Sequence, residues 1–280
     1  MNQIDAFLAT LIGKSRHTRD LYRFVLEKFW LFCGKDPSLI TIKDAQLYLA
    51  NCEEKLHYAP ASLKIHAIVL RLFLRYLHPE DWEKIRSQIK PPKPGHTKPV
   101  FASMKEIQRM EEAAMANPRD RLIIRILFAC GIRVSELCGD EEAGIPPLLI
   151  ENIDWDNRIV KVLGKGQKER FVLLDQMTVA LVDQYRERRT EGPLVTLSTR
   201  QVQRLVKAYA VKAGLRLAKL FHPHSLRHSF AIDWIRKGGD IESLRRILGH
   251  ESLDTTKLYL DFGMDQVKAA YDKIHRKTHK

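Results

Sequence analysis

The sequence predicts a mainly α-helical protein of two domains, the second of which contains a small β-hairpin. Three observations support this fold class. Apolar residues recur at helical spacing before residue 90, a proline-rich segment follows, and two β-prone runs then flank a Gly-Lys-Gly turn. The chain has 280 residues, of which 45% are hydrophobic. That length suits two domains, and that composition is sufficient for a buried core in each.

The first 90 residues are expected to form a small, entirely helical domain. Two stretches carry apolar side chains at steps of three and four residues, namely Leu21, Val25, Phe29 and Phe32 in one and Leu63, Ala67, Leu70, Leu74 and Leu77 in the other. Thr41 suits the N-cap of a further helix, and Pro60 suits a first helical turn. We therefore expect four or five short helices within residues 2–88.

The boundary between the domains is predicted at residues 91–100. The run from Lys90 to Pro99 contains four prolines, one glycine and three lysines. Prolines at this density exclude a helix and favour a semi-rigid, extended spacer. Its lysines also suit contact with a phosphate backbone.

Residues 101–280 are expected to form a second domain of mixed α and β structure. Ser103 and Glu106 make a capping box that opens a helix at Met104. The apolar residues 119–130 predict a core helix that ends at Gly131. Runs 158–163 and 169–174 flank the turn Gly164-Lys165-Gly166-Gln167, which predicts a β-hairpin.

The last hundred residues are expected to be helical. Helices are predicted near residues 176–190, 199–213, 225–237, 240–248 and 252–260. Ser198 and Gln201 form a second capping box at the start of one of them. A last amphipathic segment, about residues 264–275, places Met264, Val267, Tyr271 and Ile274 on one stripe.

The charge of the chain indicates a polyanionic partner. There are 47 basic and 34 acidic residues, a formal net charge of +13. A basic surface attracts polyanions, and phosphate neutralisation dominates the binding of nucleic acids. Nucleic acid is therefore the first partner to consider, although many basic proteins bind none.

Cysteine usage and hydropathy favour an intracellular protein. The four cysteines, Cys33, Cys52, Cys130 and Cys138, form no CxxC pair and no zinc-like cluster with histidine. Reduced thiols in the cytoplasm are the simplest explanation. The N-terminus lacks the apolar core of a signal peptide, and no uncharged run has the roughly 18–20 residues that span a bilayer.

Two arginine motifs supply candidate ligands for a phosphate group. Arg133 stands at the start of a predicted helix, with Glu136 one turn later to orient its guanidinium. His224 and Arg227 are three residues apart, so both side chains lie on one helix face. An arginine can hold two phosphate oxygens at once and keeps its charge. His228 is expected to face away from this pair.

A lysine in the hairpin turn is a candidate proton donor. Lys165 stands between two glycines, which allow the backbone to approach a bulky ligand such as DNA. Most lysines in turns are simply solvated, and Lys161 and Lys168 compete for the same role. The Gly-Lys-Gly pattern favours Lys165.

A histidine and a tyrosine near the C-terminus complete the set of candidates. His250 follows Leu248-Gly249 and can donate a hydrogen bond to a phosphate oxygen. Tyr259, nine residues on, is the candidate nucleophile. Its phenol, with an ordinary pKa near 10, needs cationic neighbours or a base. Tyr271 is assigned to packing, because it falls on the apolar stripe of the last segment.

The residue types favour phosphoryl transfer without a metal ion. That reaction needs positioning and stabilisation of charge on the phosphate oxygens. Two metal ions often supply this charge, but the sequence has no convincing cluster of aspartate and glutamate to bind them. Two arginines, a lysine and two histidines are present instead, next to a tyrosine nucleophile.

The ordered combination of these motifs resembles the tyrosine recombinases, or lambda-integrase family, and within them the Xer-type recombinases of bacteria and archaea. The resemblance is carried by residues 131–137, 164–170 and 222–259. It implies a site-specific DNA recombinase in which the protein forms a 3′-phosphotyrosine and needs neither metal, cofactor nor ATP. The implied catalytic residues are Arg133, Lys165, His224, Arg227, His250 and Tyr259.

Individual roles follow from the same resemblance. Arg133, His224, Arg227 and His250 would hold the scissile phosphate while Tyr259 attacks it. Lys165 would enter the minor groove and protonate the departing 5′-oxygen. His224 is the group expected to receive the tyrosine proton.

The resemblance also implies partners. The expected ligand is double-stranded DNA with a specific recombination site, bound by a dimer at each site and a tetramer in synapsis. Residues 1–90 would clamp the DNA as a core-binding domain, and segment 264–275 would dock onto a neighbouring subunit. No arm-binding domain of the phage-integrase kind precedes them, which favours a cytoplasmic resolver of chromosome or plasmid dimers.

One segment departs from the family pattern, and two other functions stay open. Residues 138–147 are longer and more acidic than expected, and they are interpreted as a surface loop rather than a subunit contact. One alternative is a DNA-binding protein of this fold without catalysis, which would not need Lys165, His250 and Tyr259. The other is relaxation of supercoils, as by a type IB topoisomerase, without exchange of strands.

Overall fold

The computed structural model describes residues 3–93, 99–263 and 268, except for the side chains of Ser38, Lys165 and Asp261. The predicted docking helix, about residues 264–275, lies outside the described residues apart from position 268. The chain divides into an N-terminal unit, Met1–Lys98, and a C-terminal unit, Pro99–Lys280. This division falls inside the predicted linker of residues 91–100.

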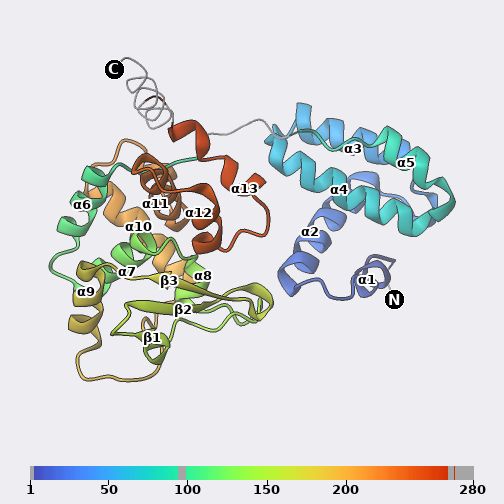
Figure 1. Cartoon of the computed structure of the whole chain (residues 1–280). Coiled ribbons are helices and arrows are strands. Elements are labelled where there is room, and N and C mark those ends of the chain that lie inside the picture. The colour runs from blue at the N-terminus through green and yellow to red at the C-terminus, as the bar shows by residue number, and fades with distance from the viewer. Residues whose placement is uncertain (1–2, 94–98, 264–267, 269–280) are drawn as a thin grey trace, which may run out of the picture. The chain divides into compact units, whose positions relative to one another are not determined.

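The N-terminal unit is built of helices, as predicted (Figure 1). They are α1 (Gln3–Ala9), α2 (Arg16–Cys33), α3 (Ile42–Glu54), α4 (Pro60–Leu77) and α5 (Trp82–Gln88), with 3-10 turns η1 (Pro37–Leu39) and η2 (Pro79–Asp81). Thr41 caps α3 in a capping box with Asp44, and Pro60 is the first residue of α4. Both local signals were therefore interpreted correctly.

The core of the N-terminal unit follows the predicted apolar stripes except at Phe32, which is 44% exposed. Val25 and Phe29 of α2 are buried against Ala67, Leu70 and Leu74 of α4 in one cluster. Burying a large apolar side chain contributes about 1.5–3 kcal/mol, so this stripe is what holds the short helices together.

The C-terminal unit combines helices with a small sheet. Its α-helices are α6 (Met104–Ala113), α7 (Pro118–Ala129), α8 (Val134–Cys138), α9 (Gln176–Arg186), α10 (Thr199–Lys212), α11 (Pro223–Arg236), α12 (Ile241–Leu248) and α13 (Asp254–Lys257). Its 3-10 turns are η3 (Ile150–Asn152), η4 (Lys165–Gln167), η5 (Ala218–Leu220) and η6 (Leu260–Gly263). Both predicted capping boxes are present, at Ser103 and at Ser198.

The predicted hairpin supplies two strands of a three-stranded antiparallel sheet in the order β1-β2-β3. The strands are β1 (Ile153–Asp154), β2 (Ile159–Leu163) and β3 (Glu169–Leu173), and β1 was not foreseen because it has only two residues. Val160 pairs with Val172, and both are buried. Because side chains alternate along a strand, Arg170 shares the inner face of β3 with Val172.

The core of the C-terminal unit consists of one cluster around α7 and a second cluster between α11, α12 and the segment after α13. Leu122, Ile123, Ile126 and Leu127 of α7 are almost wholly buried, as predicted for a core helix. A second cluster joins α11, α12 and the segment after α13, and Figure 1 shows these helices side by side. This second cluster contains Tyr259.

Two predicted segments look different in the structure. The helix expected at residues 252–260 is limited to α13, because the backbone tightens after Lys257: the Tyr259 N–H donates to the Thr256 carbonyl at 3.0 Å, an i→i−3 bond that leads into η6. The acidic segment 138–147 closes on itself through an Asp140–Ile145 bridge. It also contacts the hairpin, since Gln167 Nε2 donates to the Gly144 carbonyl at 3.1 Å.

Among the described residues, no helix combines the length and the apolar character needed to cross a bilayer.

Candidate active site

Arg133 is held at the start of α8 by a carboxylate, as the sequence predicts. Its backbone N–H and its guanidinium donate to the two oxygens of Glu136, at 2.6 and 2.8 Å. Glu136 is 1% exposed, whereas the Arg133 side chain is 34% exposed. A guanidinium has five N–H donors, so Arg133 is oriented from behind and still has donors to offer a ligand.

Arg227 lies at the ends of two helices. Its guanidinium donates to the carbonyl of Gly131, just after α7, and to that of Leu248, the last residue of α12, both at 2.6 Å. Carbonyls at helix C-termini lack helical partners and carry partial negative charge, so they suit a buried cation. Gly131 is required there, because an added Cβ would lie 2.6 Å from the Phe230 ring.

The candidate phosphate ligands act on one another electrostatically. Burial, and next the charge of Arg133, lowers the pKa of Arg227 to about 9. Burial also lowers the pKa of His250 to about 4, with further contributions from Arg227, Arg133 and Arg170. Burial and then Arg227 lower the pKa of His224. Helix α11, the loop after α12 and the start of α8 therefore bring two guanidinium groups and two neutral imidazoles within electrostatic reach of one another, an arrangement that favours a bound anion.

His250 is oriented by its neighbours. Its Nδ1 lies 2.9 Å from Thr256 Oγ1, and Thr256 is fully buried. The backbone of His250 is held as well, because its N–H donates to the Arg245 carbonyl at 3.0 Å and its carbonyl accepts from Arg245 at 2.9 Å. The other ring nitrogen, Nε2, is thus the atom left to meet a ligand.

Tyr259 is buried and bonded to a residue that we expected to face away. Its side chain is 2% exposed, and its hydroxyl lies 2.8 Å from Nδ1 of His228. Burial raises the pKa of Tyr259, and the charge of Arg227 partly opposes this. The expected orientation of His228 was wrong. His228 follows Arg227 in α11, and this step around the helix directs its ring toward the segment that carries Tyr259.

The hairpin turn begins beside the arginine cluster. A Cβ added to Gly164 would lie 3.5 Å from Glu136 Oε1. Lys165 follows it in η4, but its side chain is outside the described residues. The two competing lysines are engaged elsewhere, because Lys161 pairs with Glu169 at 2.6 Å and Lys168 pairs with Glu251.

Arg170 was missed by the sequence analysis. It donates two hydrogen bonds of 2.7 Å to Glu136, and its side chain is 11% exposed. One signal was available in the sequence. Arg170, Val172 and Leu174 are every second residue of a predicted strand, so they share its inner face, and an arginine on a buried face needs a carboxylate partner. His228 offered no comparable signal.

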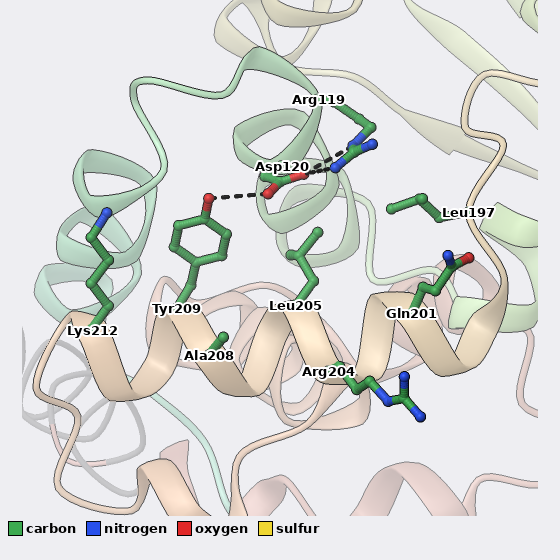
Figure 2. Close-up of a pocket in the computed structure, with 9 residues that line it drawn as sticks. All are labelled: Arg119, Asp120, Leu197, Gln201, Arg204, Leu205, Ala208, Tyr209 and Lys212. Atoms are coloured by element: carbon green, nitrogen blue, oxygen red, sulfur yellow. Dashed lines mark hydrogen bonds and ion pairs between the residues drawn. The ribbon is translucent and has the colours of Figure 1, made fainter.

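A groove between α7 and α10 lies apart from these residues. Figure 2 shows Tyr209 of α10 and Arg119 of α7 directed toward Asp120, which accepts from them at 3.0 and 2.9 Å. None of the six candidate residues lines this groove. Among the residues that the structure describes, no group of three His, Cys, Asp or Glu side chains could hold a metal ion.

Comparison with protein families assigns both units. Residues 101–265 match the phage integrase family, and residues 1–84 match the N-terminal SAM-like domain of phage integrases. Tyrosine recombinase XerA of Pyrococcus furiosus is 32% identical over 278 residues, covering 95% of this chain and 90% of the relative. Tyrosine recombinase XerC of Thermodesulfovibrio yellowstonii is 30% identical, covering 94% and 91%.

Solved structures agree with this assignment. The crystal structure of XerA recombinase is 28% identical, with a TM-score of 0.54 over 96% of this chain and 98% of that one. XerH bound to its difH substrate before cleavage has the same fold, with 22% identity, a TM-score of 0.67 and coverage of 86% and 76%. A lambda integrase dimer bound to a COC′ core site also shares the fold, with 19% identity, a TM-score of 0.69 and coverage of 90% and 94%.

Proposed function

Because this chain belongs to the phage integrase family, as a tyrosine-type site-specific DNA recombinase, we propose that it cuts DNA by forming a 3′-phosphotyrosine at Tyr259. The observation that carries this proposal is the excess of positive charge beside a buried phenol. After burial, the charge of Arg133 is the next cause that lowers the pKa of Arg227, and the charge of Arg227 is the next cause that lowers the pKa of His250; the charge of Arg227 also opposes the effect of burial on the pKa of Tyr259. Such a cluster suits a phosphodiester, whose charge must be neutralised before an oxygen nucleophile attacks it.

In this proposal the scissile phosphate is bound by Arg133, Arg227, His224 and His250. Arg133 offers the donors that Glu136 does not occupy. When the Thr256 hydroxyl donates to Nδ1 of His250, the neutral ring carries its proton on Nε2 and donates it to a non-bridging oxygen. Groups that are already oriented stabilise the developing charge without reorganising during the reaction.

The covalent step exchanges one phosphodiester for another. The Tyr259 oxygen bonds to phosphorus, the bond to the 5′-oxygen breaks, and Lys165 gives that oxygen a proton while His224 receives the phenolic proton. The 5′-hydroxyl of another strand reverses these steps, so the bond energy is retained. Since Tyr259 is 2% exposed, it must leave its contact with His228 to reach DNA.

The wider role is inferred from the relatives. The curated relatives include XerA and XerC recombinases, and solved neighbours include XerH on a difH substrate and a lambda integrase dimer on a core site. We propose that this protein acts in the cytoplasm as a dimer at each DNA site and a tetramer in synapsis, resolving chromosome or plasmid dimers. The N-terminal unit would clamp DNA, and segment 264–275 would dock onto a neighbouring subunit.

Covalent trapping on nicked DNA tests the mechanism. The duplex carries a site selected from genomic fragments that the protein retains, and adducts are resolved on a denaturing gel. Wild type should form an adduct, and Tyr259→Phe should bind the same DNA and form none. Tyr209→Phe is the matched control, because this hydroxyl is also hydrogen-bonded within the C-terminal unit, to Asp120 at 3.0 Å, away from the site.

Each outcome has a distinct meaning. An adduct that persists in Tyr259→Phe would show that another tyrosine is the nucleophile. If wild type binds a verified site and forms no adduct, the covalent mechanism is wrong and DNA binding alone remains. Relaxation of a supercoiled plasmid without recombinant product would instead support the topoisomerase-like activity.

A further inference from the structure

We propose that Arg170 is a positioning residue that sets the geometry of Arg133 and His250 and so controls the rate of DNA cleavage. This inference rests on the proposed function. The hydrogen-bond donors of Arg170 are directed at Glu136 and at the Ile247 carbonyl, and neither of these is a proposed ligand of DNA. Arg170 acts through the three chain segments that its guanidinium joins.

The contacts of Arg170 use all three nitrogens of its guanidinium. Its two terminal nitrogens donate to the two oxygens of Glu136, each at 2.7 Å, in a bidentate pair. Its Nε donates to the carbonyl of Ile247 at 2.8 Å. A bidentate arginine–carboxylate pair fixes direction as well as distance, which a lysine could not do. Arg170 therefore binds β3 to α8 and to the end of α12.

The first connection orients Arg133. Glu136 uses the same two oxygens for Arg170 and for Arg133, whose guanidinium and backbone N–H it accepts at 2.8 and 2.6 Å. Glu136 is 1% exposed, so water cannot replace a missing donor easily. Without Arg170, Glu136 would keep only its bonds to Arg133, so the carboxylate and the Arg133 guanidinium could shift together and Arg133 would lose its fixed direction.

The second connection positions the loop that carries His250. The Ile247 carbonyl belongs to the last turn of α12, two residues before Gly249 and three before His250. Gly249 ends the helix at φ +64° and packs on the Arg170 side chain, where an added Cβ would lie 2.9 Å from Cδ. The Arg170 stem therefore forms the surface on which the α12 end rests.

Charge supports the same assignment. Burial alone would raise the pKa of Glu136, but hydrogen bonds and charge from Arg170, followed by Arg133, lower it below its ordinary value. Arg170 is thus the main group that keeps Glu136 ionised, and an ionised Glu136 is what holds Arg133. Glu136 therefore lies between the two arginines and transmits the position of Arg170 to Arg133.

The experiment compares Arg170 with a matched arginine elsewhere in the same unit. Arg125 is 12% exposed, donates to Glu111 at 3.3 Å, and also binds Asp175. Arg170→Ala and Arg170→Lys are compared with Arg125→Ala and Arg125→Lys. Each is tested for adduct formation on the nicked site, for DNA retention in a gel shift, and for melting temperature.

We expect Arg170→Ala to slow adduct formation by about 100-fold, the order of magnitude for a small misplacement of catalytic groups. DNA retention should stay within about threefold, because most phosphate contacts are untouched. Arg125→Ala should lower the melting temperature as much and leave the rate near that of wild type. Arg170→Lys, which keeps the charge and loses the fork, should fall between Arg170→Ala and wild type.

Two readouts separate positioning from mere stability. Dilute guanidinium chloride, below denaturing concentration, should restore part of the rate of Arg170→Ala and none to Arg125→Ala, relative to sodium chloride. The acid limb of the pH–rate profile of Arg170→Ala should also move to higher pH. Its direction follows because burial raises the pKa of Glu136 once Arg170 is gone, and protonated Glu136 releases Arg133.

The outcomes distinguish this inference from the proposed function. If wild type forms the adduct and both Arg170 variants do so at the rate of the Arg125 variants, the inference is wrong and the function stands. If wild type forms no adduct on a verified site, the function itself fails. Should Arg170→Ala not fold, Arg170→Lys decides: a rate equal to Arg125→Lys would overturn the inference.

Discussion

Two buried arginine clusters in the C-terminal unit use the same groups and differ in charge balance. In one, Arg125 faces two carboxylates, Glu111 and Asp175. In the other, Glu136 is the carboxylate that bonds to Arg133 and Arg170, and Arg227 bonds only to backbone carbonyls among the described residues. The charge of Arg125 is therefore fully compensated, with one carboxylate to spare, whereas the second cluster carries an excess of positive charge.

The difference fits our proposal that one cluster is structural and the other binds a phosphate group. A buried ion pair is stable only when each charge finds its counter-charge. Arg125 meets that condition within the protein, because Glu111 and the half-exposed Asp175 both pair with it. In our proposal, the Arg133–Arg227 cluster meets this condition when a phosphodiester binds, so the free protein would be less stable at this cluster than the bound one.

Alanine substitution of Arg125 should mainly lower stability, whereas alanine substitution of Arg227 should mainly slow adduct formation. Arg125→Ala should cost about 3 kcal/mol of unfolding free energy, because it leaves carboxylates without a partner, and leave adduct formation nearly unchanged. Arg227→Ala should slow adduct formation about 1,000-fold. Its stability should change by only about 1 kcal/mol, since relief of repulsion from Arg133 offsets two lost hydrogen bonds. Denaturant unfolding and the nicked-site assay measure both, and equal stability losses would refute the contrast.

Acidification should destabilise the positive cluster first. The folded-state pKa values of His228 and His250 are lowered to about 4 by burial, and next by His224 and by Arg227 respectively. An unfolded histidine titrates near 6.5, so their stabilising contribution is complete above pH 6.5 and is lost as the pH falls toward 4. We expect a loss on the order of 2–4 kcal/mol over this window. Urea unfolding at pH 7 and pH 4.5 measures it, and the double variant His228→Phe/His250→Phe should show a smaller loss.

Releasing the tyrosine should speed cleavage modestly. His228→Phe keeps an aromatic ring but leaves the buried Tyr259 hydroxyl without its 2.8 Å partner. An unpaired buried hydroxyl costs about 1 kcal/mol or more, so the resting position is weakened and adduct formation should rise about fivefold. A slower reaction in this variant would mean instead that His228, rather than His224, receives the phenolic proton.

A simple anion should stabilise only the uncompensated cluster. At a concentration near its dissociation constant, sulfate would contribute about 0.4 kcal/mol, a rise of about 1–2 °C in melting temperature. Sodium chloride of equal ionic strength is the reference, and Arg227→Ala is the control that removes the general salting effect of sulfate. The same rise in Arg227→Ala would show that sulfate does not bind at this cluster.

Much of the fold could be predicted because its signals are local. Capping boxes at Ser103 and Ser198, the proline at the start of α4 and the Gly-Lys-Gly turn act within a few residues. The predicted helix at residues 252–260 was correct only for α13, because the backbone then tightens to i→i−3 bonds and continues into η6. Apolar spacing alone does not show where an α-helix changes to a 3-10 turn.

The candidate site likewise has a part that the sequence predicts and a part that it does not. Its residue types and their order along the chain are readable in the sequence, as is the Arg133–Glu136 pair, which spans one helical turn. The link from Glu136 to Arg170 spans 34 residues, and that from His228 to Tyr259 spans 31. Such contacts depend on how strands and helices pack, so a sequence pattern with helical or strand period does not contain them.

By itself, then, the sequence determined two helical units, a hairpin and a set of cationic groups with a tyrosine, since each depends on local propensity and on side-chain chemistry. Only the tertiary structure decided that the cations converge on one uncompensated cluster, that Arg170 joins its parts, and that Tyr259 rests buried against His228. The reason is physical: convergence and burial arise when distant segments exclude water together, and the charge balance of a site exists only once they have done so.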